Sequence, residues 1–351
     1  MSKNFKTKFQ NFHYSKQDLG FALKMGLSIG EFFYKNIINF KNFVYKIGLK
    51  REYKTGVSVL CVGNLTTGGV GKTPIVIKLA NEYSQTKKVA IVSRGYGAKI
   101  SNKEPVVIKD NKGVKFENGT MCGDEPYQIA KKTMGNVVVI ICKNRKKAIE
   151  HAIIKYGIEI VILDDGFSNR QIKKDRTILA IDSKMRFGNN NLLPYGPLRE
   201  PVSQISRADE IYLVDKADEN LQDAISWAKG FNKPLSVCKM RPCRIYNLQT
   251  KAEVLNRKKA VAFCAIGQPQ QFFDFAKDYY EIVETVAFDD HYKYTKDDIK
   301  KLIQIARKHK TNVFLTTQKD ETKLMEIIND FNNYSFNVLE LECVIEKLAQ
   351  D

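Results

Sequence analysis

A glycine-rich segment that follows an apolar run near residue 60 constrains the fold of this chain more than any other feature. Residues 57–62 predict a buried strand, residues 63–73 a tight loop, and residues 74–80 a helix. In such a loop the backbone N–H groups converge on phosphate oxygens, and the helix N-terminus adds partial positive charge. The segment therefore predicts a nucleoside triphosphate site formed by Thr66, Thr67, Gly68, Gly69, Val70, Gly71, Lys72 and Thr73.

Within this loop two side chains have distinct expected roles. Lys72 would reach the outer phosphates, and the Thr73 hydroxyl would bind Mg²⁺. The strict phosphate-binding pattern has a glycine where Thr66 stands, so the loop is a variant. An ordinary glycine-rich turn before a helix is the alternative. The phosphate site is favoured because strand, glycines, Lys-Thr pair and helix occur in register.

Further apolar runs predict an α/β fold. Near-continuous runs alternate with helical stretches such as residues 144–156, which indicates a parallel sheet of the P-loop NTPase type with helices on both faces. We divide the chain into an amphipathic segment (1–52), a core domain (53–230), a linker (231–256) and a smaller C-terminal α/β lobe (257–351). The expected strands are 88–93, 137–142, 158–163, 177–182, 210–214, 260–267 and 313–317.

The net charge of +18 calls for an anionic partner. Residues 1–56 hold eleven Lys or Arg but three Asp or Glu, and apolar residues recur at helical spacing from 19 to 49. Charged residues interrupt this pattern, so no run approaches the ~20 apolar residues that span a bilayer. The segment predicts a helix lying on an anionic membrane surface, with a helix docked on the protein's own core as the alternative. Nucleic acid is not an expected partner, because no basic-aromatic recognition module follows.

The seven cysteines include no C-x-x-C pair. This usage favours a reducing, cytoplasmic setting and gives no sign of a zinc site.

Carboxylates stand where ligands gather in open α/β sheets, beyond the carboxyl ends of the strands. Asp164 and Asp165 end an apolar strand, and Asp165 is a candidate Mg²⁺ ligand, although both could be plain turn residues. Asp124 opens a helix, where an N-cap is the alternative role. Asp290 and His291 form an acid–imidazole pair, and a surface histidine is equally compatible with the pattern.

Taken together, these segments resemble the tetraacyldisaccharide 4′-kinase family of lipid A biosynthesis. The block at residues 192–201 has no generic structural explanation, which makes the match specific. The resemblance implies transfer of the ATP γ-phosphate to the 4′-hydroxyl of an acylated glucosamine disaccharide 1-phosphate at the cytoplasmic face of the inner membrane. The matching segments are residues 63–74, 93–97, 123–126, 164–167, 186–189, 192–201, 266–267, 290–291 and 317–320.

The resemblance also implies roles for individual residues. Asp124 would accept the hydroxyl proton, with His291 and its neighbour Asp290 as partners, and pairing with imidazole lets the proton rest on the stronger base. Lys72 and Mg²⁺ would neutralise charge on the transferring phosphoryl group. The implied metal ligands are Thr73, Asp165 and Glu200, and the implied substrate contacts are Arg94, Tyr96 and Arg199.

The chain departs from the family pattern at two places. Ser168-Asn169 replace a usual Gln-His, and Asp289-Asp290-His291-Tyr292 replace Pro-Asp-His-His. A membrane-recruited partitioning-type ATPase is the alternative function, but that class carries a lysine where Thr67 stands.

Overall fold

The computed structural model divides the chain into two compact units. The first comprises residues 1–239 and 345–351, and the second residues 240–344. The residues that the structure describes are 11–14, 18–117, 119–215, 220–254, 258–267, 269–289, 292–325 and 327–348.

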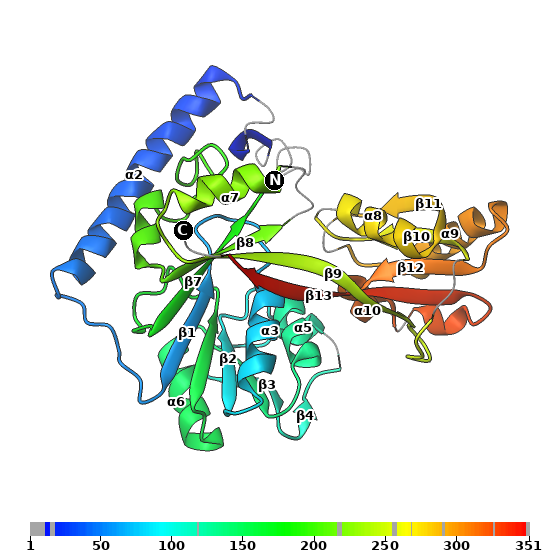
Figure 1. Cartoon of the computed structure of the whole chain (residues 1–351), viewed down its shortest axis with the longest axis horizontal. Helices are drawn as coiled ribbons and strands as arrows, with labels where there is room; N and C mark the ends of the chain where they lie inside the picture. The colour runs from blue at the N-terminus through cyan, green and yellow to red at the C-terminus, as the bar shows by residue number, and fades with distance from the viewer. Residues whose placement is uncertain are drawn as a thin grey trace. The chain divides into compact units, whose positions relative to one another are not determined.

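The first unit is built on a mainly parallel sheet (Figure 1). Strands β8, β7, β1, β6, β2 and β5 lie side by side in parallel, and β3 and β4 extend the edge in antiparallel orientation. The apolar runs found in the sequence form these parallel strands, which confirms the expected parallel α/β sheet. The strands are β1 (Ser58–Gly63), β2 (Val89–Ser93), β3 (Val106–Asp110), β4 (Gly113–Val114), β5 (Val137–Ile141), β6 (Ile160–Asp164), β7 (Arg176–Asp182) and β8 (Glu210–Asp215).

Helices cover both faces of this sheet. Val59 and Cys61 of β1 pack with Ala148 and Ile149 of α6 in one apolar cluster. The intervening residue Leu60 is also buried, and α3 contacts β1, β2 and β6. Burial on both faces explains why the strands read as continuous apolar runs. The helices are α3 (Lys72–Tyr83), α4 (Gly119–Cys122), α5 (Asp124–Lys132), α6 (Arg145–Tyr156), α7 (Leu221–Lys229) and the 3₁₀ helix η1 (Val202–Arg207).

Helix α2 (Phe21–Lys46) lies along the outside of the first unit (Figure 1). None of its residues is fully buried. Its contacts with the body include a hydrogen bond, a close approach and an apolar contact. Glu31 accepts a hydrogen bond from the Leu192 N–H (2.7 Å), Gly30 lies so close to Pro194 that a β-carbon would stand 2.9 Å from the proline ring, and Tyr34 packs against an apolar cluster of the body. Among the described residues, no helix has the length and apolarity needed to cross a membrane.

The second unit has its own parallel strands in the order β11, β10, β12, β13. Its core contains Phe314 stacked on Phe336, with ring centroids 4.8 Å apart. Residues 231–256, interpreted from the sequence as a linker, contain β9 (Leu235–Asn247), which runs from the first unit into the second. The remaining elements are β10 (Lys259–Cys264), α8 (Pro269–Tyr279), β11 (Glu281–Ala287), α9 (Lys296–Lys308), β12 (Val313–Thr317), α10 (Gln318–Leu324), η2 (Ile328–Asp330) and β13 (Ser335–Lys347).

Residues 11–14 pack against the proline- and glycine-containing segment 187–197. The Asn189 N–H donates to the His13 carbonyl (2.9 Å), and Nε2 of His13 lies 3.0 Å from the Pro194 carbonyl oxygen. The Phe12 ring meets Tyr195 edge-on, with centroids 5.2 Å apart. Burial lowers the pKa of His13 from its usual value, and the contact with Pro194 opposes only part of this effect.

This burial predicts a pH-dependent packing of residues 11–14. The packed form holds His13 neutral, so acidification through the ordinary histidine pKa of about 6.5 favours the released, protonated form, and stability of the packing is lost as pH falls. In an NMR titration, we expect one imidazole to titrate below about pH 6.5 and to be absent from His13→Gln. A His13 midpoint at or above 6.5 would contradict this account.

Candidate active site

The glycine-rich loop (residues 63–73) connects β1 to α3 at the carboxyl edge of the sheet. Gly68 and Gly71 have φ angles of 102° and 97°, a left-handed region that side chains disfavour. Two contacts hold the middle of the loop: the Thr67 N–H donates to the Pro197 carbonyl (2.8 Å), and the Tyr14 hydroxyl donates to the Thr67 carbonyl (3.3 Å). The loop therefore presents the start of α3 at the strand ends, as an anion site requires.

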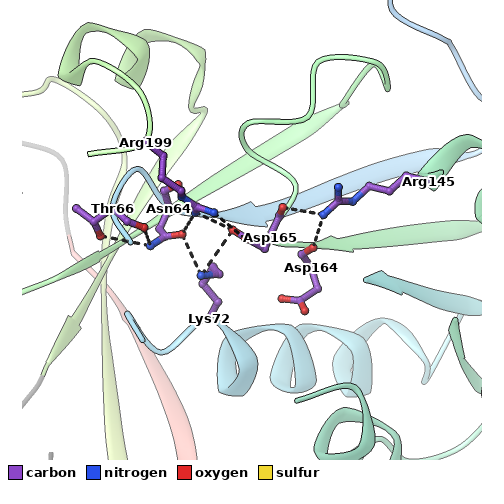
Figure 2. A network of polar contacts seen from close by, with 7 residues as sticks. All are labelled: Asn64, Thr66, Lys72, Arg145, Asp164, Asp165 and Arg199. Atoms are coloured by element: carbon purple, nitrogen blue, oxygen red, sulfur yellow. Dashed lines mark hydrogen bonds and ion pairs between the residues drawn. The ribbon is translucent and has the colours of Figure 1, made fainter. Parts of the chain in front are cut away.

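Lys72, Asp165 and Arg199 meet beside this loop (Figure 2). The Arg199 guanidinium donates to both carboxylate oxygens of Asp165, at 2.8 Å each. Nζ of Lys72 lies 3.6 Å from Oδ1 of Asp165 and donates to Oδ1 of Asn64 (2.9 Å). Asn64 in turn donates to the Thr66 carbonyl (2.7 Å). One polar network thus joins the loop, the end of β6 and the segment after residue 192.

Arg145 supports the same strand end from the other side (Figure 2). Its guanidinium is buried and donates to the main-chain carbonyls of Asp164 (3.2 Å) and Asp165 (2.9 Å). Asp165 has a φ angle of 51°, which is uncommon for a residue with a side chain and costs free energy. By donating to these two carbonyls, Arg145 stabilises the turn at Asp165.

The adjacent carboxyl groups of Asp164 and Asp165 have opposite electrostatic environments. Burial raises the pKa of Asp164 to about 6, and the Asp165 charge adds to this, while Lys72 opposes it. Burial also raises the pKa of Asp165, but the hydrogen bonds from Arg199 and the nearby Lys72 outweigh it and hold that pKa well below its usual range. Asp165 therefore remains ionised at neutral pH.

An ionised carboxylate next to the phosphate-binding lysine suits Mg²⁺ bound with phosphate. Mg²⁺ takes one or two protein oxygens and fills its octahedron with phosphate oxygens and water. Asp165 and Thr73, at the start of α3, supply oxygens of the required type. The donor set of the site therefore fits this ion.

Two other predicted site segments lie against each other. Asp124 is the first residue of α5, and Gly123 before it has a φ angle of 94°. A β-carbon at Gly123 would stand 2.9 Å from the Tyr96 carbonyl oxygen, so the turn containing Arg94 and Tyr96 contacts the start of α5. The Tyr96 side chain is 91% exposed, which leaves it available to a substrate.

Glu200 is almost fully buried, and its carboxylate forms an ion pair with Arg207. Its role as a metal ligand stays a prediction. Asp290 and His291 lie outside the described residues; their flanking elements are β11 and α9.

Comparison with known proteins identifies the family of this chain. The family model described as LpxK, tetraacyldisaccharide-1-P 4′-kinase, matches residues 23–351. The chain belongs to the tetraacyldisaccharide 4′-kinase family. A tetraacyldisaccharide 4′-kinase of Halothermothrix orenii is 33% identical, with 90% of this chain and 87% of the relative covered. That of Elusimicrobium minutum is 32% identical, with 93% and 87% covered.

A solved structure shows the same fold. LpxK from Aquifex aeolicus in complex with ATP superposes with a TM-score of 0.74 at 31% identity, covering 92% of this chain and 95% of that chain. Membership of the kinase family supports the kinase interpretation over a partitioning-type ATPase.

Asn64 and Arg145 were missed in the sequence. Asn64 lies two residues before Thr66, where the phosphate pattern begins, so the motif gives it no weight. Arg145 opens α6 just after β5, and this position at the carboxyl edge of the sheet was a usable signal. Both residues belong to the network around Asp165.

At its departure from the kinase family pattern, the chain uses Asn169 to stabilise its own turn. Oδ1 of Asn169 accepts the Gln171 N–H (3.0 Å), and the Asn169 N–H donates to the Gly166 carbonyl (3.0 Å). The Ser168 Oγ is buried. In this structure the amide of Asn169 holds the backbone after Asp165.

Proposed function

We propose that this protein transfers the γ-phosphate of ATP to the 4′-hydroxyl of tetraacyldisaccharide 1-phosphate and forms lipid IVA. The observation that carries the proposal is the network of Lys72, Asp165 and Arg199 beside the glycine-rich loop. It joins a cation for phosphate and an ionised carboxylate for Mg²⁺ at one strand edge, as phosphoryl transfer in P-loop enzymes requires. Membership of the kinase family supports the lipid substrate.

In this site the chain's own residues bind and orient the triphosphate. The loop N–H groups and the start of α3 face the phosphates, and Lys72 neutralises charge on the outer ones. Lys72 and Arg199 pair with Asp165 in this structure, so binding of phosphate exchanges part of those pairs for contacts with phosphate oxygens. Thr73 and Asp165, with Glu200 as a further ligand, would hold Mg²⁺, which would supply electrostatic stabilisation of the transferring group.

Asp124 accepts the proton of the attacking hydroxyl. An aspartate is in general a weak base at neutral pH. The resemblance to the kinase family supplies His291 and its neighbour Asp290, which lie outside the described residues, as its partners in proton transfer. Arg94, Tyr96 and Arg199 contact the substrate and its phosphate. The contact between the Tyr96 turn and the start of α5 supports this grouping.

Helix α2 attaches the enzyme to the cytoplasmic face of the bacterial inner membrane as a peripheral protein. Nine apolar side chains, eight on α2 and Ile47 directly after it, recur at helical spacing, and each of these nine is half or more exposed. Its contacts with the body are made by other residues, such as Glu31 and Gly30. An apolar stripe that the body leaves uncovered suits a lipid interface rather than a core. The stripe comprises Phe21, Met25, Ile29, Phe32, Phe33, Ile37, Phe40, Phe43 and Ile47.

Removal of the Lys72 ammonium should abolish turnover. We expect Lys72→Ala to lower the rate of phosphate transfer from ATP at least ~10²-fold, because one charge on the transferring group is left unneutralised. Lys78→Ala is the matched control, since Lys78 lies on the same helix and forms an exposed pair with Glu82 (3.4 Å). Normal transfer by Lys72→Ala would remove the loop from catalysis.

Asp124→Asn separates proton transfer from nucleotide binding. We expect a rate lowered by about 10²- to 10⁴-fold, with ATP affinity nearly unchanged, because the lost group acts only on the hydroxyl. Glu125→Gln removes a neighbouring exposed carboxylate from the same helix start and should keep the rate. Equal rates for the two variants, measured with radiolabelled ATP, would exclude Asp124 as the base.

Vesicle binding tests the stripe on α2. The double change Phe32→Ser, Phe40→Ser should weaken binding to anionic phosphatidylglycerol vesicles by about tenfold or more, because two aromatic side chains no longer enter the interface. Ile154→Ser is the control, since Ile154 is 84% exposed but lies on α6. Unchanged sedimentation of the double variant with vesicles would instead favour a helix that serves only the protein's own body.

A further inference from the structure

Helix α2 contacts two segments that lie beside the nucleotide site, one at Arg199 and one at Ser168. The Tyr34 hydroxyl donates to the carbonyl oxygen of Arg199 (2.9 Å). About two helical turns further along the same face, Nζ of Lys41 donates to the carbonyl oxygen of Ser168 (2.8 Å). Both side chains are half-buried on the inner face of the helix. The helix therefore forms hydrogen bonds with main-chain carbonyls beside the site and not with the side chains of the site.

The two carbonyls belong to segments that meet at a single ion pair. Arg199 carries the guanidinium that donates to both oxygens of Asp165. Ser168 ends the turn that begins at Asp165. A shift of either backbone would misalign the bidentate geometry, which depends on two parallel hydrogen bonds.

In the turn after Asp165, three consecutive main-chain carbonyls accept hydrogen bonds from lysine side chains. Lys174 donates to the carbonyls of Phe167 (3.3 Å) and Asn169, and Lys41 donates to the carbonyl between them. This is the turn in which Ser168 and Asn169 depart from the family pattern. Lys41, from α2, thus helps to hold this turn in place. The turn is also where the sequence of this chain differs from the family pattern.

The Lys41 ammonium is partly buried near other charged groups. Burial lowers the pKa of Lys41, the Glu200 carboxylate opposes this effect, and Arg207 and Arg170 add to it. Arg207 in turn forms an ion pair with the buried carboxylate of Glu200. The Ser168 carbonyl is the hydrogen-bond acceptor of the Lys41 ammonium.

We propose that Tyr34 and Lys41 are positioning residues of the nucleotide site, through which α2 sets the relative placement of Arg199 and Asp165. The proposal gives the inner face of α2 a role separate from lipid attachment, which belongs to its outer face. It predicts that nucleotide and Mg²⁺ affinity depend on a helix that touches neither ligand.

The test measures Mg²⁺–ATP binding to the full chain by calorimetry without lipid, so it stands whether or not the lipid is the phosphate acceptor. We expect Tyr34→Phe and Lys41→Met each to weaken ATP binding by about three- to tenfold, the range for one lost hydrogen bond. As ATP binding weakens, the Mg²⁺ concentration needed for half-saturation should rise, because Asp165 is displaced. Lys41→Arg, which keeps a donor, should restore most of the affinity.

Matched controls come from the same helix. Tyr45→Phe removes a hydroxyl, and Lys35→Met removes an exposed ammonium; both should bind Mg²⁺–ATP as the parent does. Vesicle binding should be unchanged in Tyr34→Phe and Lys41→Met, since the outer stripe is intact. Unchanged ATP and Mg²⁺ affinity in these two variants would overturn the proposal. So would an affinity loss accompanied by loss of vesicle binding and a lowered melting temperature, which would show general detachment of α2.

Discussion

The bidentate pair between Arg199 and Asp165 is the interaction on which the site depends. It joins the end of β6 to the segment after residue 192. Arg199 also donates to the Asn64 carbonyl, and Asn64 donates to the Thr66 carbonyl, so the pair is connected to the glycine-rich loop. The pair also keeps Asp165 ionised despite burial. A partly buried charge pair of this kind costs desolvation, so its value lies in placing charge accurately for a ligand rather than in stability.

Much of the sheet could be predicted from sequence, because parallel strands buried on both faces are continuous apolar runs. Strands β9 and β13 could not: each is thirteen residues long and only partly buried, and β9 contains Pro242 and several charged residues. Such strands depend on neighbours far away in the chain. Local composition therefore suggested a linker at residues 231–256.

The site residues also divide into those that could be predicted from the sequence and those that could not. Lys72 and Asp165 could be predicted because their roles attach to short motifs with fixed neighbours. The partnership of Arg199 with Asp165 could not, because the two residues are joined by the fold and not by spacing. Arg145 acts through main-chain carbonyls, and Asn64 acts through contacts with Lys72, Arg199 and Thr66 that only the fold brings together. The partners proposed for Asp124 lie outside the described residues.

The most direct test of the central claim is the fate of the γ-phosphate. Purified protein would receive ³²P-labelled ATP, Mg²⁺ and tetraacyldisaccharide 1-phosphate in mixed micelles. A tetraacyldisaccharide 4′-kinase transfers the label to the lipid, and ³¹P NMR of the product places the new phosphate at the 4′ position. Hydrolysis of ATP with no labelled lipid, or phosphate at another hydroxyl, would contradict the account.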